Sequence, residues 1–138
     1  MRHLTTFGIV LTVLLAGCAT TPTASTGSEV AGTWGESPAD CQENPHTISF
    51  SPHGDTMDVR YPQGGTADDK SLQERFSYQV LGRSSSGLQL ALVGESRTDS
   101  SGQKVTWELR QTDKNQYCWW RSDWPENECT TARIRCGP

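Results

Sequence analysis

Apolar and polar residues alternate along most of the chain after residue 30, which is the pattern of β-strands with one buried face. Turn-forming residues separate the alternating stretches, and no stretch has the longer period of an extended amphipathic helix. The pattern predicts about eight strands, at residues 30–35, 46–51, 56–61, 75–81, 88–92, 104–111, 116–121 and 130–136. We therefore predict an all-β domain, an antiparallel meander that either closes as a small barrel or packs as a sandwich.

The connections between the predicted strands are mostly short turns. Residues 52–55 read Pro-His-Gly-Asp and predict a tight hairpin between the second and third strands. The longest connection follows the third strand, where residues 62–69 form a predicted Gly-Gly loop and residues 71–74 a predicted single helical turn. The sequence does not give the order of the strands in the sheet.

The first 17 residues have the composition of a secretory signal peptide. A basic start that contains Arg2 precedes an apolar run from Phe7 to Leu15, which is too short to span a membrane. Residues 18–29 are small and polar without apolar periodicity, so we expect them to form a tether. Residues 30–138 remain for one β domain of a size that usually folds as a single unit.

The signal peptide ends in Leu15-Ala16-Gly17-Cys18, which resembles the lipobox of bacterial lipoproteins. The resemblance implies that the chain is cut before Cys18 and that this cysteine carries the acyl chains of a membrane anchor. Ala19 stands where an aspartate marks retention in the inner membrane in enterobacterial members of that family. The resemblance therefore implies an outer-membrane lipoprotein, and we predict that its domain faces the periplasm, although the sequence does not decide the side.

Four cysteines remain after Cys18, an even number that favours two disulfides in an oxidising compartment: Cys41, Cys118, Cys129 and Cys136. Three pairings are open to sequence reasoning. Among them we favour a local bond between Cys129 and Cys136 and a long-range bond between Cys41 and Cys118. No two of these cysteines have the close spacing of a zinc knuckle, so we predict no metal site.

The first predicted strand contains Gly32-Thr33-Trp34, which resembles the Gly-x-Trp signature of calycin barrels such as lipocalins, avidins and bacterial metalloprotease inhibitors. In that family the tryptophan plugs one end of the barrel, so the resemblance implies this place for Trp34. A barrel of eight strands has room for one small ligand. A calycin-like carrier of an apolar ligand would line its cavity with Trp34, Phe50, Tyr78, Leu90 and Trp107.

Aromatic residues are densest near residues 117–125. Trp119 and Trp120 are adjacent in a predicted strand and therefore point to opposite faces, but the sequence does not decide which one is buried. An exposed tryptophan beside paired charges is typical of protein interfaces, so the candidate partner-binding residues are Trp120, Arg121, Asp123 and Trp124. In the alternative, Trp120 packs under the loop at Trp124 and Arg121 pairs with Asp123 as a purely structural corner.

Two other groups of charged residues are better explained by structure than by chemistry. If their strands pair as a hairpin, the first group predicts cross-strand ion pairs: Glu95, Arg97, Glu108 and Arg110. The second group lies in or beside a turn, where such residues need no catalytic or metal-binding explanation: His53, Asp55 and Asp58.

Charge and missing motifs restrict the function. The net charge of −4 becomes −5 when Arg2 leaves with the signal peptide, which disfavours nucleic acid and suits a basic partner. The chain lacks the nucleophile elbow, zinc-protease, phosphate-loop and dinucleotide motifs, so we predict a non-enzyme without a cofactor. We predict that the domain binds and inhibits an envelope protein, such as a lysozyme, a protease or a toxin. The alternatives are the carrier and a structural subunit of an envelope assembly.

Overall fold

The computed structural model describes residues 28–62 and 74–137. The predicted signal peptide, the lipobox with Cys18 and most of the tether lie outside the described residues. The predicted Gly-Gly loop and nearly all of the helical turn before residue 75 lie outside them as well. No helix within the described residues is long and apolar enough to cross a membrane.

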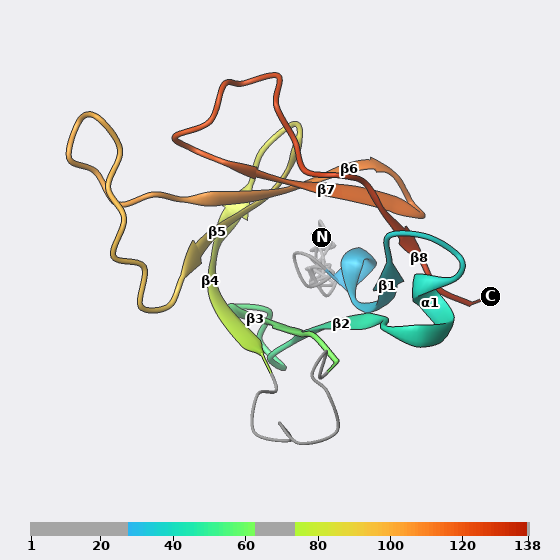
Figure 1. Cartoon of the computed structure of the whole chain (residues 1–138). Coiled ribbons are helices and arrows are strands. Elements are labelled where there is room, and N and C mark those ends of the chain that lie inside the picture. Colours follow the sequence, from blue (N-terminus) through green and yellow to red (C-terminus); the bar gives the residue numbers. More distant parts are fainter. Residues whose placement is uncertain (1–27, 63–73, 138) are drawn as a thin grey trace, which may run out of the picture.

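Eight antiparallel strands close into a barrel in which each strand pairs with the next along the chain (Figure 1). In order they are β1 (Gly32–Gly35), β2 (His46–Phe50), β3 (Thr56–Arg60), β4 (Arg75–Arg83), β5 (Gly87–Leu92), β6 (Trp107–Asp113), β7 (Gln116–Arg121) and β8 (Arg133–Arg135). β8 pairs with β1, where Trp34 lies opposite Arg135, and this pairing closes the barrel. The all-β prediction is confirmed, and of its two architectures the barrel is the one formed.

The β2–β3 hairpin shows how the alternation of the sequence becomes an inside and an outside. Ile48 lies opposite Val59, and both side chains are buried in the barrel. The outward Asp58 instead accepts hydrogen bonds from Arg75 and Ser77 on β4. At the turn, Gly54 has a φ of 73°, a left-handed conformation that glycine adopts without the steric cost of a Cβ. The turn thereby fixes the register that puts both apolar side chains inside.

Two short helices flank the first strand. The 3₁₀ helix η1 (Ser28–Val30) precedes β1, and the single-turn helix α1 (Asp40–Glu43) follows it on the outside of the barrel (Figure 1). Asp40 accepts a hydrogen bond from the Glu36 backbone at 2.8 Å, which ties α1 to the end of β1. Neither helix is predicted by the sequence pattern, because each is too short to show helical periodicity.

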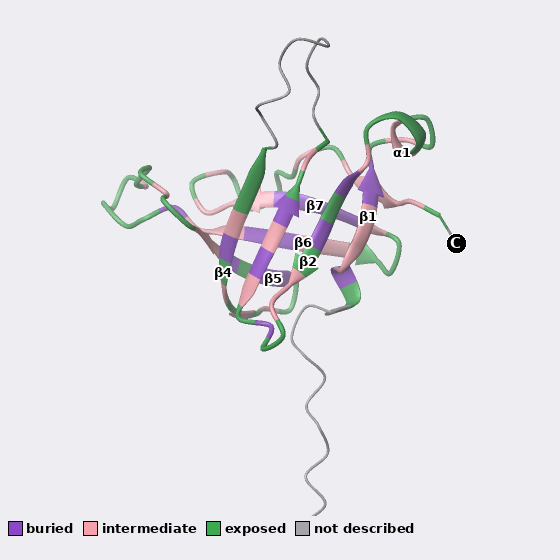
Figure 2. Ribbon diagram, turned by 90° about the horizontal axis from the view of Figure 1, so that it is seen from below, coloured by how far each residue is buried: buried purple, intermediate pink, exposed green. Residues whose placement is uncertain are grey.

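The hydrophobic core lies inside the barrel, and Figure 2 marks the buried residues of the strands in purple. Its buried members come from all strands except β8, together with η1: Val30, Trp34, Ile48, Met57, Val59, Tyr78, Leu88, Leu90, Leu109, Tyr117 and Trp119. Gly87 allows β5 and β6 to approach closely, since a Cβ there would lie 2.0 Å from the Leu109 carbonyl oxygen. The barrel interior is therefore packed with side chains along most of its length.

One end of the barrel, which we call the sealed end, is closed by η1 and Trp34. The Trp34 indole N–H donates to the Val30 carbonyl oxygen at 2.9 Å. The Arg135 guanidinium lies 4.2 Å from the centroid of the Trp34 ring and donates to the carbonyl oxygens of Glu29 at 2.5 Å and Ala31 at 2.9 Å. These bonds join the first and last elements of the domain, so η1 is held as a plug.

Two disulfides are present, as predicted, but they join different partners. Cys41 pairs with Cys136, and Cys118 pairs with Cys129, with Cα–Cα distances of 5.4 and 5.9 Å. The predicted bonds between Cys129 and Cys136 and between Cys41 and Cys118 are therefore wrong. Two contacts of the folded chain decide the pairing, and the spacing of the cysteines along the sequence does not reveal them. The β1–β8 pairing brings Cys136 beside α1, and the segment after β7 folds back along that strand.

Candidate functional site

The end of the barrel opposite η1, which we call the open end, contains a cleft with a volume of about 420 Å³. Six aromatic side chains line it: Tyr61, Phe76, Tyr78, Trp107, Trp119 and Trp124. Leu92, Thr130 and three charged residues complete the lining. A volume of several hundred Å³ with mostly aromatic walls is characteristic of small-molecule sites.

The strand directions explain why these residues gather. In an up-and-down barrel, odd-numbered strands end at the same rim at which even-numbered strands begin. Tyr61 directly follows β3, Phe76 lies near the start of β4, and Trp107 is the first residue of β6. Phe76 and Tyr78 are two residues apart and thus share one face of β4. The cleft is therefore built by residues distant in sequence that share one end of the fold.

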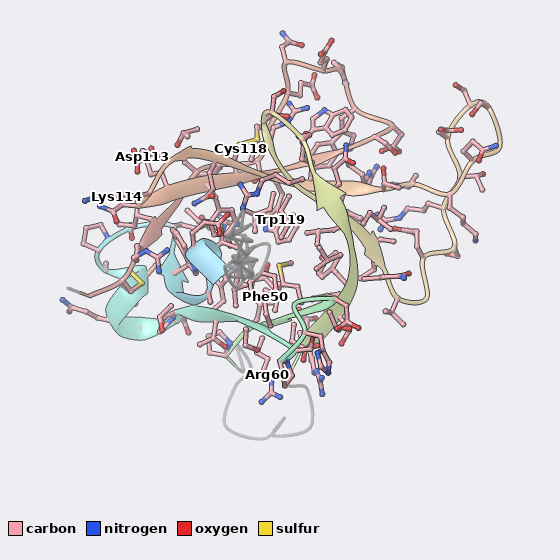
Figure 3. All side chains as sticks on the ribbon, turned by 180° about the vertical axis from the view of Figure 1, so that it is seen from behind. Phe50, Arg60, Asp113, Lys114, Cys118 and Trp119 are labelled. Carbon is pink, nitrogen blue, oxygen red and sulfur yellow. A yellow bond between two sulfur atoms is a disulfide. The ribbon has the colours of Figure 1, made fainter. Side chains whose placement is uncertain are left out.

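The aromatic rings of the cleft support one another. Tyr78 stacks on Trp119 with ring centroids 5.4 Å apart, and Trp107 meets Trp119 edge to face at 6.1 Å. Trp124 extends the cluster outward, with its ring 6.2 Å from that of Trp107. Figure 3 shows Trp119 directed from β7 into the barrel. Trp119 is buried, so it forms part of the floor of the cleft, whereas Trp124 forms part of its rim.

Ion pairs hold the rim on the side of β6. Glu95 accepts two hydrogen bonds from the Arg97 guanidinium, at 2.8 and 2.7 Å, and one from the Trp107 indole N–H at 3.2 Å. The bonds from Arg97 lower the pKa of Glu95 to about 2, so the carboxylate is ionised at neutral pH. The Arg97 guanidinium lies 5.3 Å from the Trp107 ring centroid. The pair thus fixes the orientation of Trp107.

Arg121 and Asp123 form a second rim pair. The Arg121 guanidinium donates to both carboxylate oxygens of Asp123, at 2.5 and 3.0 Å, and lies 4.9 Å from the Trp124 ring centroid. Three of the four candidate partner-binding residues, Arg121, Asp123 and Trp124, therefore lie together at the open end. Trp124 lines the cleft, and Arg121 lies near the rings of both Trp124 and Trp107, at 5.6 Å from the latter's centroid.

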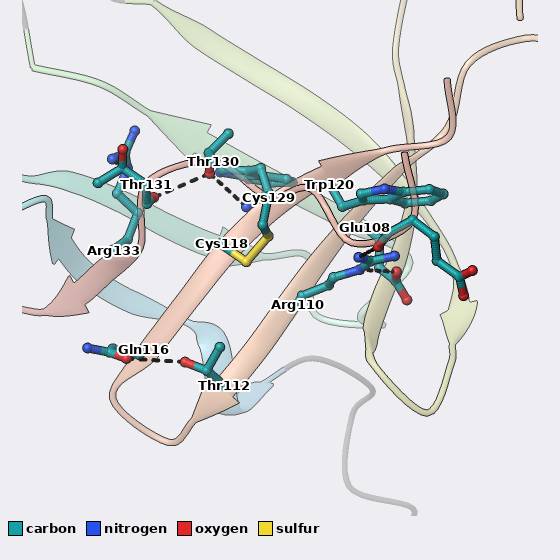
Figure 4. The surroundings of a disulfide bond; sticks show 12 residues. Glu108, Arg110, Thr112, Gln116, Cys118, Trp120, Cys129, Thr130, Thr131 and Arg133 are labelled. Atoms are coloured by element: carbon teal, nitrogen blue, oxygen red, sulfur yellow. Dashed lines mark hydrogen bonds and ion pairs between the residues drawn. A yellow bond between two sulfur atoms is a disulfide. The ribbon is translucent and has the colours of Figure 1, made fainter. Parts of the chain in front are cut away.

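The fourth candidate residue, Trp120, lies on the outer face of β7 (Figure 4). Its indole N–H donates to the Pro125 carbonyl oxygen at 2.9 Å, and the Arg110 guanidinium covers its ring at 4.3 Å from the centroid. The Cys118–Cys129 disulfide lies on the same face. Of the two adjacent tryptophans, Trp119 is the buried one, and the structure separates Trp120 from the cleft.

Arg133 lines the cleft on the side of β8. Its guanidinium pairs with Glu36 through Nη1 at 2.5 Å, and its side chain is 16% exposed, against 56% for Glu36. Below it, His46 Nε2 and the Tyr117 hydroxyl are hydrogen-bonded at 2.5 Å, and the His46 ring stacks on Tyr61. Burial, and then the nearby Arg133 charge, lower the pKa of His46 to about 4, so this histidine is neutral at pH 7.

The two groups of charged residues that the sequence assigns to structural roles can be located directly. Glu95 pairs with Arg97, and Glu108 with Arg110, so the predicted cross-strand ion pairs are wrong. The cause is that β5 ends at Leu92, before Glu95, and Gln89 lies opposite Glu108. In the β2–β3 turn, Asp55 accepts a hydrogen bond from Ser51. No group of three or more potential metal ligands gathers among the described residues.

The sequence predicts only part of the cleft. Of the five residues expected to line a carrier cavity, Tyr78 and Trp107 do so. Trp34 and Leu90 are fully buried in the packed core, and Phe50 packs against it from β2. The missed residues include Tyr61, Phe76, Arg97 and Arg133. The strand order of a closed meander would identify them. In that order, the end of each odd-numbered strand and the start of each even-numbered strand lie at the same rim of the barrel.

Comparison with models of known protein families finds no match, and comparisons with curated proteins and with solved structures find none either.

Proposed function

We propose that the domain is a ligand-binding β-barrel that takes one small, largely apolar molecule into the cleft at its open end. The observation that carries this proposal is the aromatic cleft of about 420 Å³, which six aromatic side chains line at one end of a closed barrel. Aromatic rings that are already positioned by one another lose little conformational freedom when a ligand binds, which favours affinity. The function is that of a carrier or a sensor of a small molecule.

The packing of the barrel limits where the ligand can lie. Met57, Leu90 and Leu109 are fully buried in the middle of the barrel, and η1 with Trp34 closes the sealed end. A ligand therefore enters from the open end and rests on the floor made by Tyr78 and Trp119. The size of the cleft suits one molecule of two or three fused or linked rings.

The proposed site of action is the outer membrane. The lipobox ending in Cys18 supports lipid anchoring, and Ala19 after it supports the outer membrane as destination. The plug formed by Trp34 and Arg135 supports the calycin-like reading of Gly32-Thr33-Trp34. The described chain begins at the sealed end, so an anchor at Cys18 would join the barrel on the side opposite the cleft.

A fluorescence titration with N-phenylnaphthylamine, a neutral aromatic probe, tests the proposal. Every described contact of the barrel lies within residues 28–137, so the chain from Ala19 onward carries the whole described fold. We expect one saturable site per molecule. Trp124→Ala removes one wall of the cleft and should weaken binding about tenfold, since burial of a large aromatic side chain against a partner contributes roughly 1 to 2 kcal/mol.

Trp120→Ala is the matched control, because it removes the same side chain from the outer face of the barrel. It should leave probe affinity within about twofold. Equal losses in the two variants, or no saturable binding to the unmodified domain, would contradict the cleft as the site. Circular dichroism of both variants distinguishes lost binding from lost folding.

Inhibition of an envelope protein stays a prediction, and so does a structural role in an envelope assembly. Trp120 has its indole N–H bonded to Pro125 and its ring covered by Arg110, which supports a structural role for this residue. A pull-down from envelope extract with the Trp120→Ala/Trp124→Ala double variant tests the interface. Capture of a hydrolase by the unmodified domain, lost in the double variant, would favour the inhibitor over the carrier.

A further inference from the structure

The cleft has an arginine on each of two walls, and the two differ in how their hydrogen-bonding groups are used. Arg97 donates from Nε and Nη2 to the Glu95 side chain, so the flat edge of its guanidinium is already satisfied by a carboxylate. This bidentate geometry leaves little of Arg97 for a ligand. Arg97 acts as a support for Trp107.

Arg133 is arranged differently. Both of its contacts with the described residues use Nη1: the ion pair with Glu36 at 2.5 Å and a long hydrogen bond to the Thr131 carbonyl oxygen at 3.5 Å. A guanidinium carries five N–H donors, and those on Nε and Nη2 have no acceptor among the described residues. No buried side-chain nitrogen or oxygen of the described residues is left without a partner, so these donors face accessible space.

The accessible space beside Arg133 is the cleft. Arg133 lines it together with Tyr61, Trp119 and Thr130, and its side chain is 16% exposed. A guanidinium that is largely removed from water interacts with an anion more strongly than an exposed one, because less solvent screens the charge. Glu36, its partner, is 56% exposed and lies on the outer side of the pair. Glu74 also lines the cleft, but it is exposed and therefore well screened.

We propose that the ligand of the cleft is an organic anion, whose carboxylate, sulfonate or phosphate group binds Arg133 while its planar apolar body lies on Tyr78 and Trp119. This inference rests on the proposed function and names the chemical class of its ligand. The free Nε and Nη2 edge matches the two oxygens of such a group. The acidic net charge of the protein would repel an anionic ligand. This repulsion acts over longer distances than the contact with Arg133 and is screened at physiological salt.

Two probes that share one skeleton test the proposal. Anilinonaphthalene sulfonate carries an anionic group that N-phenylnaphthylamine lacks, and both report binding by fluorescence. We expect the anionic probe to bind the chain from Ala19 onward at least about tenfold more tightly than the neutral probe, because one hydrogen bond to a charged group contributes about that much affinity. Arg133→Gln should remove that preference by weakening the anionic probe about tenfold, with the neutral probe changed less than about twofold.

Arg83→Gln is the matched control, because Arg83 also pairs with a glutamate, Glu29, but lies at the sealed end. It removes the same charge and should leave both affinities unchanged. Glu36→Gln releases Nη1 of Arg133 and should strengthen the anionic probe a few-fold. Near-ultraviolet circular dichroism of each variant establishes that the barrel is intact.

The outcomes separate the two proposals. If both probes bind equally and Arg133→Gln changes neither, the cleft binds apolar molecules and the anion proposal is overturned. If the anionic probe is weakened equally by Arg83→Gln and Arg133→Gln, the preference reflects net charge and the proposal is likewise overturned. If neither probe binds, both the proposed function and this inference fail.

Discussion

His46, near the open end, is held by residues that lie far from it in the sequence. It is buried beneath Arg133, bonded to the Tyr117 hydroxyl and stacked on Tyr61. Nothing in its local sequence predicts this environment, since His46 simply opens a strand. For Trp34, which is fully buried, the Gly-x-Trp resemblance implied a place inside the barrel.

His46 makes the stability of the domain depend on pH. Its pKa is lowered to about 4 in the folded state, whereas an unfolded histidine titrates near 6.5. The unfolded chain therefore binds a proton first as pH falls, and the free energy of unfolding decreases between about pH 6.5 and pH 4. Between pH 7 and pH 4.5 we expect a loss of about 2 kcal/mol from this residue, measured by chemical denaturation.

His46→Gln should remove most of that slope, because glutamine does not titrate. His53→Gln, in the exposed β2–β3 turn, is the control and should retain it. An unchanged slope in the His46 variant would mean that another group controls the pH dependence.

Strands, turns and disulfides differ in how far the sequence predicts them. All eight strands overlap the predicted ranges, with ends that differ by up to three residues, because the apolar and polar alternation of most strands is a local signal. The cysteine pairing depends on which strands become neighbours at closure, which no single segment encodes. Thr130 illustrates this: its backbone N–H donates to the Trp119 carbonyl oxygen at 2.9 Å, and its Oγ1 accepts from the Trp119 N–H at 2.9 Å. That return of the chain along β7 brings Cys129 to Cys118.

The two disulfides should contribute unequally to stability. Cys41–Cys136 closes a loop with a sequence separation of 95, and Cys118–Cys129 closes one of 11. On the chain-entropy model the longer loop stabilises by roughly 4 to 5 kcal/mol and the shorter by about 3 kcal/mol. Urea denaturation of the Cys41→Ala/Cys136→Ala and Cys118→Ala/Cys129→Ala variants measures the difference.

The short disulfide should matter more for the cleft, because the loop it closes carries Trp124. We expect the Cys118→Ala/Cys129→Ala variant to bind the neutral probe more weakly at a temperature where both variants remain folded. A larger loss of binding in the Cys41→Ala/Cys136→Ala variant would contradict this division of roles.

At the scale of the whole molecule, the two ends of the barrel differ in structure. The sealed end joins η1, β1 and β8 through Trp34 and Arg135, while the open end carries the aromatic cleft and its rim of ion pairs. The acidic net charge describes the surface as a whole and does not reveal the arginines at the open end. The sequence therefore predicts the architecture well and the cleft only in part, since the cleft exists only once the barrel has closed.

Binding of a small molecule at the open end can be tested with the NMR signals of the five tryptophan indole N–H groups during titration with N-phenylnaphthylamine. We predict that the signals of Trp107, Trp119 and Trp124 shift with one common dissociation constant. The signals of Trp34, at the sealed end, and Trp120, on the outer face, should stay in place. Shifts confined to Trp34 or Trp120, or no shifts at saturating probe, would contradict this prediction.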